Sequence, residues 1–448
     1  MARLFGTDGV RGVANAELTC ELAMRLGQAA VRFMGSPIVV GRDTRLSGDM
    51  LQAALVAGIA SAGGDALIAG IVPTPAVALL VREMRAAGGI VISASHNPPE
   101  YNGIKCFDAQ GFKLPDAVED DIQAFVEAGG LDALDGDALP VGAGVGVAIE
   151  LEDAAETYIR HAVDSVASQG IDFSGLHVAL DCGHGASSLT SAEALRRLGA
   201  EVTVVHDDFD GMDINVGCGS TCLDPLREVM AASGADVGIA HDGDADRVML
   251  LSKDGVGIDG DIVEAVIARD MKMRGCLPHD TVVSTVMANL GFVRAMEDLG
   301  IAVKQTKVGD RYVLEEMLVG GFALGGEQSG HMILLDYNST GDGLMTACQF
   351  LCAVRRSGCA VEDAIAIMKR FPQTLVNVRV RDKRALEGCA PVRDAVAAAE
   401  ARMGSDGRVL VRTSGTEPVV RVMVEASRAE IARSCAESIA AVVERELA

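Results

Sequence analysis

Short apolar segments followed at once by polar, glycine-containing loops recur in four successive parts of the chain. The four loops are residues 93–98, which run on to 101–105 with Gly103, and residues 241–247, 325–331 and 412–418. Over the first 150 residues these strand-like segments alternate with helical patterns, the rhythm of a mixed or parallel sheet covered by helices. In open α/β sheets ligands bind where the strands end. The repeat therefore predicts α/β units whose loops form the functional site.

The length of 448 residues predicts three or four domains, since one domain normally holds about 100–200 residues. We expect an α/β protein with three similar α/β domains that contain mixed sheets, followed by a smaller α+β domain, around a central cleft. The expected boundaries are 1–150, 151–251, 252–368 and 369–448.

Residue patterns also predict individual elements. Helices are expected at 17–34, 47–62, 76–84 and 429–447, with Ser47 as the N-cap of the second. Strands are expected at 37–40, 66–71, 89–93, 177–180, 201–205, 237–240, 281–286, 301–305, 322–324, 375–380, 409–412 and 419–425.

The net charge of −24 repels nucleic acid and anionic membrane surfaces. It also repels phosphorylated molecules, so a phosphate site must be built locally from backbone N–H groups and a few placed Arg and Lys. No apolar stretch resembling a signal peptide follows Met1, and the most apolar stretch, 66–81, is too interrupted to span a bilayer. We expect a cytoplasmic protein that binds neither nucleic acid nor membranes.

The 11 cysteines are scattered, and no two pairs stand at the spacing of a zinc site. Cys218 and Cys222 are four residues apart, as are Cys348 and Cys352. We expect these thiols to be small buried apolar groups in a reducing compartment.

The first candidate for chemistry is loop 93–98, with the sequence SASHNP. A serine held in a tight loop beside His and Asn, here Ser95, is a candidate nucleophile. A hydroxyl that attacks phosphorus needs a proton acceptor and cations near the phosphoryl oxygens, and His96 and Lys105 could supply them. The alternative is a turn that only caps a helix.

Three carboxylates stand at alternate positions in the second loop: Asp242, Asp244 and Asp246. They can converge on one hard cation while Gly243 lets the chain bend. The set suits Mg²⁺ completed by a phosphate, whereas the closing Glu of an EF-hand is missing. Arg247, directly after the triad, suits phosphate binding. The alternative is a solvated acidic turn.

The third loop, 325–331, combines a carboxylate, an amide, a hydroxyl and an imidazole within the sequence GGEQSGH. Glu327 can accept hydrogen bonds from adjacent sugar hydroxyls or an amine. His331 can bind phosphate or exchange a proton. The alternative is an ordinary glycine-rich turn.

The fourth loop, 412–418, has the sequence RTSGTEP, and Arg421 follows closely. Hydroxyls, a glycine and two arginines can form a phosphate cradle, although a plain β-turn is the alternative. The N-terminal loop FGTDGVRG, 5–12, carries Arg11, which could reach a shared cleft. The four loops are candidates for a serine loop (93–98), a metal loop (241–247), a sugar loop (325–331) and a phosphate loop (412–418). Together they predict one cleft to which each domain contributes one side.

In this order the motifs resemble those of the α-D-phosphohexomutase superfamily, over essentially the whole chain. The resemblance implies that Ser95 carries a phosphoryl group and that Mg²⁺ is held by its phosphate and the three aspartates. It also implies a sugar loop, a phosphate loop and cations around the transferred group. The residues so assigned are Glu327, Ser329 and His331 for the sugar, Arg412, Ser414, Gly415, Thr416 and Arg421 for the phosphate, and His96, Lys105, Arg11 and Arg247 around the transferred group; Asp310 is expected to help orient the substrate.

The opening FGTDGVRG, Gln328 and the late RTSGTEP are similar to the branch of the superfamily that acts on glucosamine phosphates. This implies conversion of glucosamine 6-phosphate to glucosamine 1-phosphate, a precursor of UDP-N-acetylglucosamine, through a 1,6-bisphosphate. The implied cofactors are one Mg²⁺ per chain and a sugar 1,6-bisphosphate as activator. The implied partners are the phosphosugar, a second copy of the chain in a homodimer, and a kinase or autophosphorylation that primes Ser95.

Three alternatives stay open at this point. A phosphomannomutase/phosphoglucomutase of the same superfamily would prefer other hexose phosphates. A metal-dependent phosphohydrolase would release inorganic phosphate and need no bisphosphate. A sugar-phosphate sensor built on the same scaffold would need neither Ser95 nor the aspartate triad.

Overall fold

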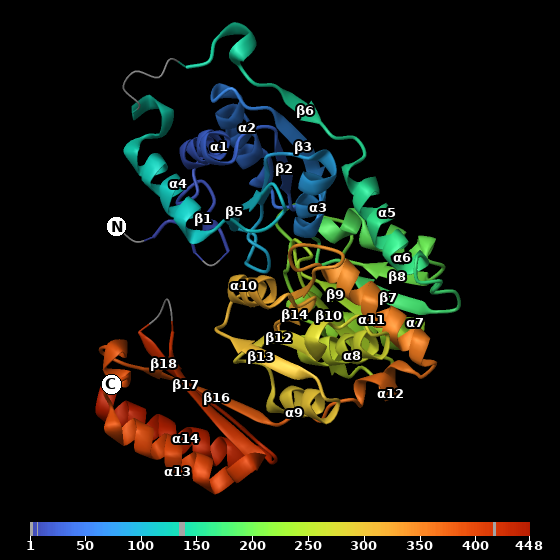
Figure 1. The fold of residues 1–448 in the computed structure, drawn as a ribbon, viewed down its shortest axis with the longest axis vertical. Coiled ribbons are helices and arrows are strands. Elements are labelled where there is room, and N and C mark those ends of the chain that lie inside the picture. The colour runs from blue at the N-terminus through green and yellow to red at the C-terminus, as the bar shows by residue number, and fades with distance from the viewer. Residues whose placement is uncertain (1–2, 7, 134–138, 415–417) are drawn as a thin grey trace. The chain divides into compact units, whose positions relative to one another are not determined.

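Four sheets follow one another along the chain in the computed structural model, which describes residues 3–6, 8–133, 139–414 and 418–448 (Figure 1). Helices accompany the first three sheets, which are mixed, and the last sheet is antiparallel. The contacts within the chain divide it into two units: unit 1 is Met1–Met287 with Ile301–Ile367, and unit 2 is Ala288–Gly300 with Met368–Ala448. The predicted fold class, three α/β domains and a smaller α+β domain, is confirmed.

The first sheet has six strands, and its core lies between the sheet and the helices α1, α2 and α4. Its strand order is β1 (Val10–Val13), β5 (Tyr101–Asp108), β4 (Gly88–Ile92), β2 (Ile38–Arg42), β3 (Ala66–Ile71) and β6 (Ala148–Glu150). The helices are α1 (Cys20–Met34), α2 (Gly48–Ser61), α3 (Thr74–Met84) and α4 (Asp116–Ala128). β2 is parallel to β3 and β4, whereas β5 is antiparallel to β4 and β1.

The second sheet has five strands, of which β7 is parallel to both of its neighbours. Its order is β11 (Gly257–Ile258), β10 (Val248–Ser252), β9 (Val237–His241), β7 (His177–Asp181) and β8 (Glu201–Val205). The accompanying helices are α5 (Ala154–Ala167), α6 (Ser191–Arg197) and α7 (Asp224–Ser233). Leu226 and Met230 of α7 pack on the sheet against Ala179 and Leu251.

The third sheet has four strands, with β12 parallel to β13 and β14, and β15 antiparallel to β14. Its order is β13 (Ala302–Thr306), β12 (Thr281–Thr285), β14 (Leu324–Gly326) and β15 (Met332–Leu334). The helices of this part are α8 (Gly260–Met273), α10 (Asp310–Gly320), α11 (Gly343–Ser357) and α12 (Val361–Ile365). None of the helices among the described residues combines the length and the apolar character needed to cross a bilayer.

Unit 2 is built on a three-stranded antiparallel sheet whose core is completed by two long helices. The strand order is β16 (Gln373–Arg379), β18 (Val419–Ala426) and β17 (Gly407–Thr413), and the helices are α13 (Ala390–Met403) and α14 (Ala429–Leu447). The short helix α9 (Leu290–Asp298) also belongs to this unit, although it lies between β12 and β13 in the sequence.

Most predicted elements are present within one to three residues, and the differences have local causes. The first helix begins at Cys20 and not at the predicted residue 17, because Thr19 caps it. The Thr19 Oγ1 accepts a hydrogen bond from the Leu22 N–H. Ser47 does precede α2, but its hydroxyl accepts from the Asn102 side chain instead of capping the helix. Segment 101–105, taken from sequence as part of the serine loop, is the start of strand β5.

Candidate active site

Ser95 lies in the loop that follows β4, and its side chain is fully buried. Its backbone N–H donates to Ser93 Oγ at 2.9 Å, and Ser93 Oγ in turn donates to Asp43 Oδ2 at 2.6 Å. Its φ is 51°, in the left-handed region that residues other than glycine seldom adopt. The loop is therefore held in one specific conformation and is more than a helix-capping turn.

Arg45 lies in the loop that follows β2, and its fully buried guanidinium holds the serine loop. Its Nε donates to Asp43 Oδ2 at 3.0 Å. Its two terminal nitrogens donate to four backbone carbonyl oxygens, those of Ser95 (2.9 Å), Asn97 (2.7 Å), Pro98 (2.5 Å) and Tyr101 (3.0 Å). Sequence reasoning missed Arg45, although it stands in a polar loop after a buried strand, the same signal that revealed Ser95.

The three aspartates follow β9 and are brought directly to Ser95. Ser95 Oγ donates to Asp242 Oδ2 at 2.7 Å, although the two residues are 147 positions apart. One carboxylate oxygen from each of Asp242, Asp244 and Asp246 lies within 4.8 Å of the others. Because all three residues are at most 3% exposed, a solvated acidic turn does not describe the loop.

The role expected for Gly243 differs from the one the structure gives it. The left-handed residue in this loop is Ala245, with φ of 52°, so Gly243 is not needed for the bend. A Cβ at Gly243 would instead lie 2.8 Å from the Ser95 carbonyl oxygen and 2.9 Å from the Asn215 amide nitrogen. Glycine is required because the metal loop and the serine loop approach so closely.

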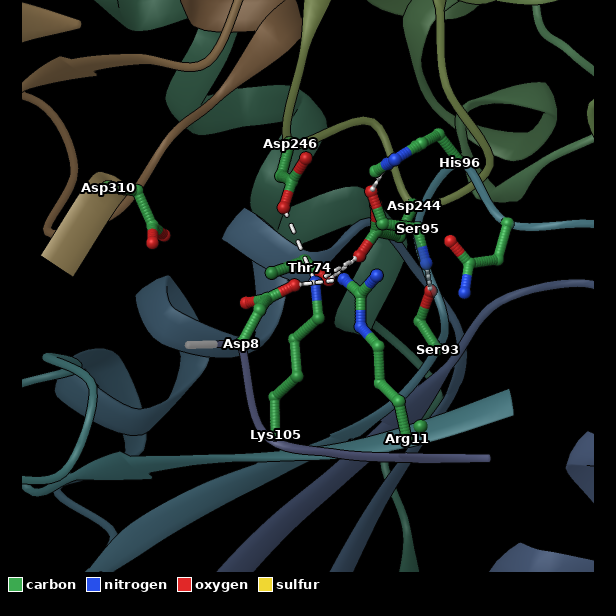
Figure 2. A network of polar contacts seen from close by, with 12 residues as sticks. Asp8, Arg11, Thr74, Ser93, Ser95, His96, Lys105, Asp244, Asp246 and Asp310 are labelled. Atoms are coloured by element: carbon green, nitrogen blue, oxygen red, sulfur yellow. Dashed lines mark hydrogen bonds and ion pairs between the residues drawn. The ribbon is translucent and has the colours of Figure 1, made fainter. Parts of the chain in front are cut away.

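Lys105 on β5 lies among three carboxylates that come from the N-terminal loop and from the loop after β9 (Figure 2). Its Nζ is 2.8 Å from Asp244 Oδ2, 3.3 Å from Asp246 Oδ2 and 2.9 Å from Asp8 Oδ2. Burial lowers the pKa of Lys105, but these three carboxylates raise it well above its ordinary value. The ammonium is therefore a permanent positive charge beside the triad.

The triad has the properties of a site for a divalent cation. Burial, and then the neighbouring Asp246 and Asp244, raise the pKa of Asp242 to about 8. Asp244 Oδ1 and Asp246 Oδ1 are buried and have no hydrogen-bond partner among the described residues. Carboxylate oxygens that are buried, lack hydrogen-bond partners and repel one another fit a hard ion such as Mg²⁺.

His96 and Arg247 stand on the cavity side of this cluster. His96 Nδ1 is 3.2 Å from Ser95 Oγ, and burial, with Arg247 and Arg11, lowers its pKa to about 4. The imidazole is therefore neutral near pH 7 and can accept a proton. Arg11 forms an ion pair with Asp8, and Arg247 Nε is 3.7 Å from Asp246 Oδ1.

The third loop follows β14 and meets the metal loop at a backbone bridge between His331 and Arg247. His331 Nδ1 is 3.7 Å from Asp246 Oδ1, and its Nε2 is 3.5 Å from Asp310 Oδ2. Burial lowers the pKa of His331, yet Asp246 raises it above its ordinary value. Glu327 Oε1 accepts from the Gly309 N–H at 3.0 Å.

A cavity of about 510 Å³ opens over these groups, a suitable volume for a small polar ligand. The predicted site residues along its wall are Arg11, His96, Asp246, Arg247, Glu327 and His331, and Asp8 and Asp310 lie beside them. Ser329 does not line it and is exposed. Lys113, which the sequence analysis did not select, pairs with both Asp8 and Asp310.

The fourth loop belongs to unit 2, so its residues are described there. Arg412 on β17 lies directly opposite Arg421 on β18 in the strand register. Burial and then Arg421 lower the pKa of Arg412, and Lys383 Nζ donates to the Ser414 carbonyl oxygen at 2.8 Å. Like charges at directly opposite positions of two paired strands destabilise the pairing unless an anion offsets them. Gly415 and Thr416 lie outside the described residues.

Four family models cover this chain in order: phosphoglucomutase/phosphomannomutase α/β/α domain I over residues 2–132, domain II over 156–255, domain III over 259–371 and the C-terminal domain over 375–442. The chain belongs to the phosphoglucomutase/phosphomannomutase family, whose members are phosphosugar-mutating enzymes. It is 49% identical over 453 residues to the phosphoglucosamine mutase of Mycolicibacterium gilvum, with all of both chains covered.

Solved structures of the same fold extend over nearly the whole chain. A phosphoglucomutase/phosphomannomutase family protein of Burkholderia thailandensis superposes with a TM-score of 0.81 at 25% identity, covering 99% of this chain and 97% of that one. The N-acetylphosphoglucosamine mutase of Aspergillus fumigatus, solved with GlcNAc-6P and magnesium, has a TM-score of 0.71 at 17% identity, with 99% and 95% covered.

Proposed function

We propose that the chain is a phosphoglucosamine mutase, which interconverts glucosamine 6-phosphate and glucosamine 1-phosphate. The observation that carries this proposal is the 2.7 Å hydrogen bond from Ser95 Oγ into the buried aspartate triad. It joins a nucleophile to a set of metal ligands, of which Asp246 lines the cavity. Support for the amino sugar comes from the relative of that name, 49% identical over the full length.

In the first step the phosphoryl group of phosphorylated Ser95 passes to the substrate. The bond from phosphorus to Ser95 Oγ breaks and a bond to O1 of glucosamine 6-phosphate forms. O1 loses its proton and Ser95 Oγ gains one, so the serine is left as a hydroxyl. The product is glucosamine 1,6-bisphosphate, which turns end for end without leaving. Lys105, Arg11 and Arg247 are the cations that surround the transferred group and offset its charge.

In the second step the bisphosphate's 6-phosphoryl group returns to Ser95. The bond from phosphorus to O6 breaks and Ser95 Oγ attacks, so the serine proton must leave and O6 must gain one. Asp242 Oδ2 at 2.7 Å and the neutral His96 Nδ1 at 3.2 Å are the two acceptors beside that hydroxyl. Glucosamine 1-phosphate is released and the phosphoserine is restored.

The residues that would hold Mg²⁺ are Asp242, Asp244 and Asp246, with the phosphate on Ser95 as a further ligand. When bound there, the ion would offset the charge on the phosphoryl oxygens in the transition state. Glu327 and His331 on the cavity wall are placed to meet sugar hydroxyls or the amine. In unit 2, Arg412, Ser414, Gly415, Thr416 and Arg421 are proposed to bind the phosphate that does not react.

Several finer expectations remain predictions of the same proposal. A sugar 1,6-bisphosphate should activate the enzyme by restoring phosphate lost from Ser95. The first phosphate would come from a kinase or from autophosphorylation, which incubation of the purified protein with ATP distinguishes. A homodimer in solution and a cytoplasmic location are expected from the resemblance, and light scattering tests the former.

Replacing Ser95 by alanine tests the proposed phosphoryl carrier. The Ser95→Ala variant should lose all measurable mutase turnover, because neither step can proceed without Oγ, while its circular dichroism stays unchanged. Intact-mass analysis should find a phosphorylated fraction in the wild-type protein and none in the variant. Normal turnover of Ser95→Ala would refute the assignment.

A comparison of substrates tests the sugar. Turnover should be highest on glucosamine 6-phosphate and lower on glucose 6-phosphate and mannose 6-phosphate. A preference for either neutral sugar would favour the phosphomannomutase/phosphoglucomutase alternative. Stoichiometric release of inorganic phosphate would indicate a phosphohydrolase.

A further inference from the structure

The second sheet carries another group of metal-ligating side chains, apart from the aspartate triad. The described residues contain two such groups of three, and the second consists of Asp181, His206 and Cys218. Asp181 and Cys218 are fully buried, and the side chain of His206 is 27% exposed. None of the three takes part in the proposed phosphoryl transfer.

The fold brings these residues together at one sheet edge. Asp181 is the last residue of β7, and His206 directly follows β8, which runs parallel beside it with Asp181 opposite Val205 (Figure 1). The chain after β8 then returns to the same edge, where the Gly219 N–H donates to Asp181 Oδ2 at 2.9 Å. This contact places Cys218 next to the carboxylate.

The atoms face one another in the manner of ligands that share an ion. One ligand atom from each residue lies within 4.8 Å of the other two. His206 Nδ1 is 3.0 Å from Asp181 Oδ1, yet it is a buried nitrogen without a hydrogen-bond partner among the residues described. A nitrogen and a carboxylate oxygen can lie this close when either a proton on the imidazole or a shared metal cation lies between them.

The surroundings hold the ligands in these positions. The Gly183 N–H donates to Asp181 Oδ1 at 2.9 Å, so both carboxylate oxygens are oriented from outside the cluster. His206 has a left-handed backbone, with φ of 51°, which the contacts around it must maintain. Orienting contacts of this kind typically surround metal ligands.

We propose that Asp181, His206 and Cys218 bind one borderline transition-metal ion of the zinc class, at a site distinct from the Mg²⁺ site. Sulfur, imidazole and carboxylate together select Zn²⁺ or Co²⁺ and not Mg²⁺, which prefers oxygen ligands only. Binding breaks the Cys218 S–H bond, releases that proton to solvent and forms a sulfur–metal bond. Three protein ligands leave a fourth position for water.

The ion would stabilise the segment that supports the serine loop. Asn215 lies three residues before Cys218, and its side-chain amide donates to the Ser95 carbonyl oxygen at 2.9 Å. Its backbone N–H donates to the Gly183 carbonyl oxygen at 2.9 Å, which fastens the same segment to the loop after β7. Binding of Zn²⁺ should therefore raise the unfolding temperature of the whole protein.

Cobalt titration of the full-length, metal-free protein tests the site, because Co²⁺ reports its own ligands spectroscopically. We expect one equivalent to produce a thiolate-to-cobalt charge-transfer band that Zn²⁺ abolishes and excess Mg²⁺ leaves unchanged. The Cys218→Ser variant should lose the band. The His206→Gln variant should bind cobalt more weakly by at least roughly 10- to 100-fold. That is the range typical of losing a supporting residue around a metal.

Two matched variants keep the test specific. Cys222→Ser removes a thiol four residues away that is outside the cluster, and it should keep the band. Asp244→Asn disables the aspartate triad and should keep it too. The proposal is overturned if wild-type protein gives no charge-transfer band, or if Cys218→Ser, shown by circular dichroism to be folded, gives the same band. If Cys218→Ser does not fold, undiminished cobalt affinity in His206→Gln overturns it equally.

Discussion

The backbone of Ser95 adopts a conformation that costs a residue other than glycine about 1–3 kcal/mol, and it persists only because its neighbours enforce it. Arg45 contributes through hydrogen bonds to three carbonyl oxygens of the loop and to that of Tyr101 at the start of β5. A planar guanidinium can reach several acceptors at once, whereas an ammonium is a single point of charge. Arg45 is therefore a positioning residue for the phosphoryl carrier.

Replacing Arg45 by lysine should keep the charge and lose the geometry. We expect kcat to fall roughly 100-fold, the effect of misplacing a reacting atom by about 1 Å, with a small change in KM. Steady-state kinetics on glucosamine 6-phosphate measures both constants. Arg42→Lys is the matched control, since Arg42 pairs with the exposed Asp49 and should retain near-normal kcat. An unchanged kcat in Arg45→Lys would show that the Arg45 hydrogen bonds to the carbonyl oxygens are not needed for turnover.

The loop after β9 concentrates three buried carboxylates, so its stability should depend on a divalent cation. Chelation with EDTA should abolish mutase turnover, and Mg²⁺ should restore it. Added Mg²⁺ should also raise the unfolding temperature of the wild-type protein, because the ion binds the folded state and offsets repulsion within the triad. Differential scanning calorimetry measures the shift, which Asp244→Asn should reduce. An equal shift in that variant would place the stabilising ion elsewhere.

The position of helix α9 in the sequence does not indicate the unit to which it belongs. It lies between two strands of the third sheet in the chain, yet it belongs to unit 2. Glu425 of β18, fully buried, accepts from Asn289 Nδ2 at 3.1 Å and from the Leu290 N–H at 2.9 Å. It also pairs with Arg408 Nε at 2.7 Å. One carboxylate thus joins α9 to the antiparallel sheet.

Glu425→Gln removes the charge while keeping the shape, and should lower the free energy of unfolding by about 1.5–3 kcal/mol, the usual value for hydrogen bonds to a charged group. Urea denaturation measures it. The control Glu437→Gln changes an exposed residue of α14 and should alter that energy by less than about 0.5 kcal/mol. Equal effects of the two substitutions would argue against the role given to Glu425.

The whole molecule must bind one phosphate that reacts and one that does not. The residues proposed to act on the transferred phosphate are in unit 1, whereas Arg412 and Arg421, opposite each other in the strand register, are in unit 2. Two guanidiniums at opposite register positions concentrate positive charge, which suits an anion. This supports a phosphate-binding role for them, although neither lies near Ser95 in the sequence.

Arg421→Gln should therefore raise KM for glucosamine 6-phosphate by roughly 10- to 100-fold, because one charged hydrogen bond is worth about 1.5–3 kcal/mol. Arg433→Gln, on the exposed surface of α14, should leave KM unchanged. Initial-rate measurements over a range of substrate concentrations separate the two. Unaltered KM in Arg421→Gln would remove that residue from the substrate site.

Local pattern by itself determined much of this protein. The segment 66–71 was predicted as a strand and is β3, and the amphipathic stretch 429–447 is α14. Ser95, the aspartate triad and His331 were also selected as candidates from sequence, because each follows a strand in a polar loop, and the structure places them close together. Such features depend on neighbouring residues, whose periodicity and turn chemistry are visible along the chain.

Only the tertiary structure decided which of these loops meet and what else meets them. Local patterns do not relate Arg45 to the serine loop that it binds, or His206 to the nearby Cys218. Nor do they indicate that α9 belongs to unit 2. The packing of strands and helices sets such distances, and burial then changes the chemistry. Burial converts three ordinary aspartates into a cation site because it removes the water that would otherwise solvate them.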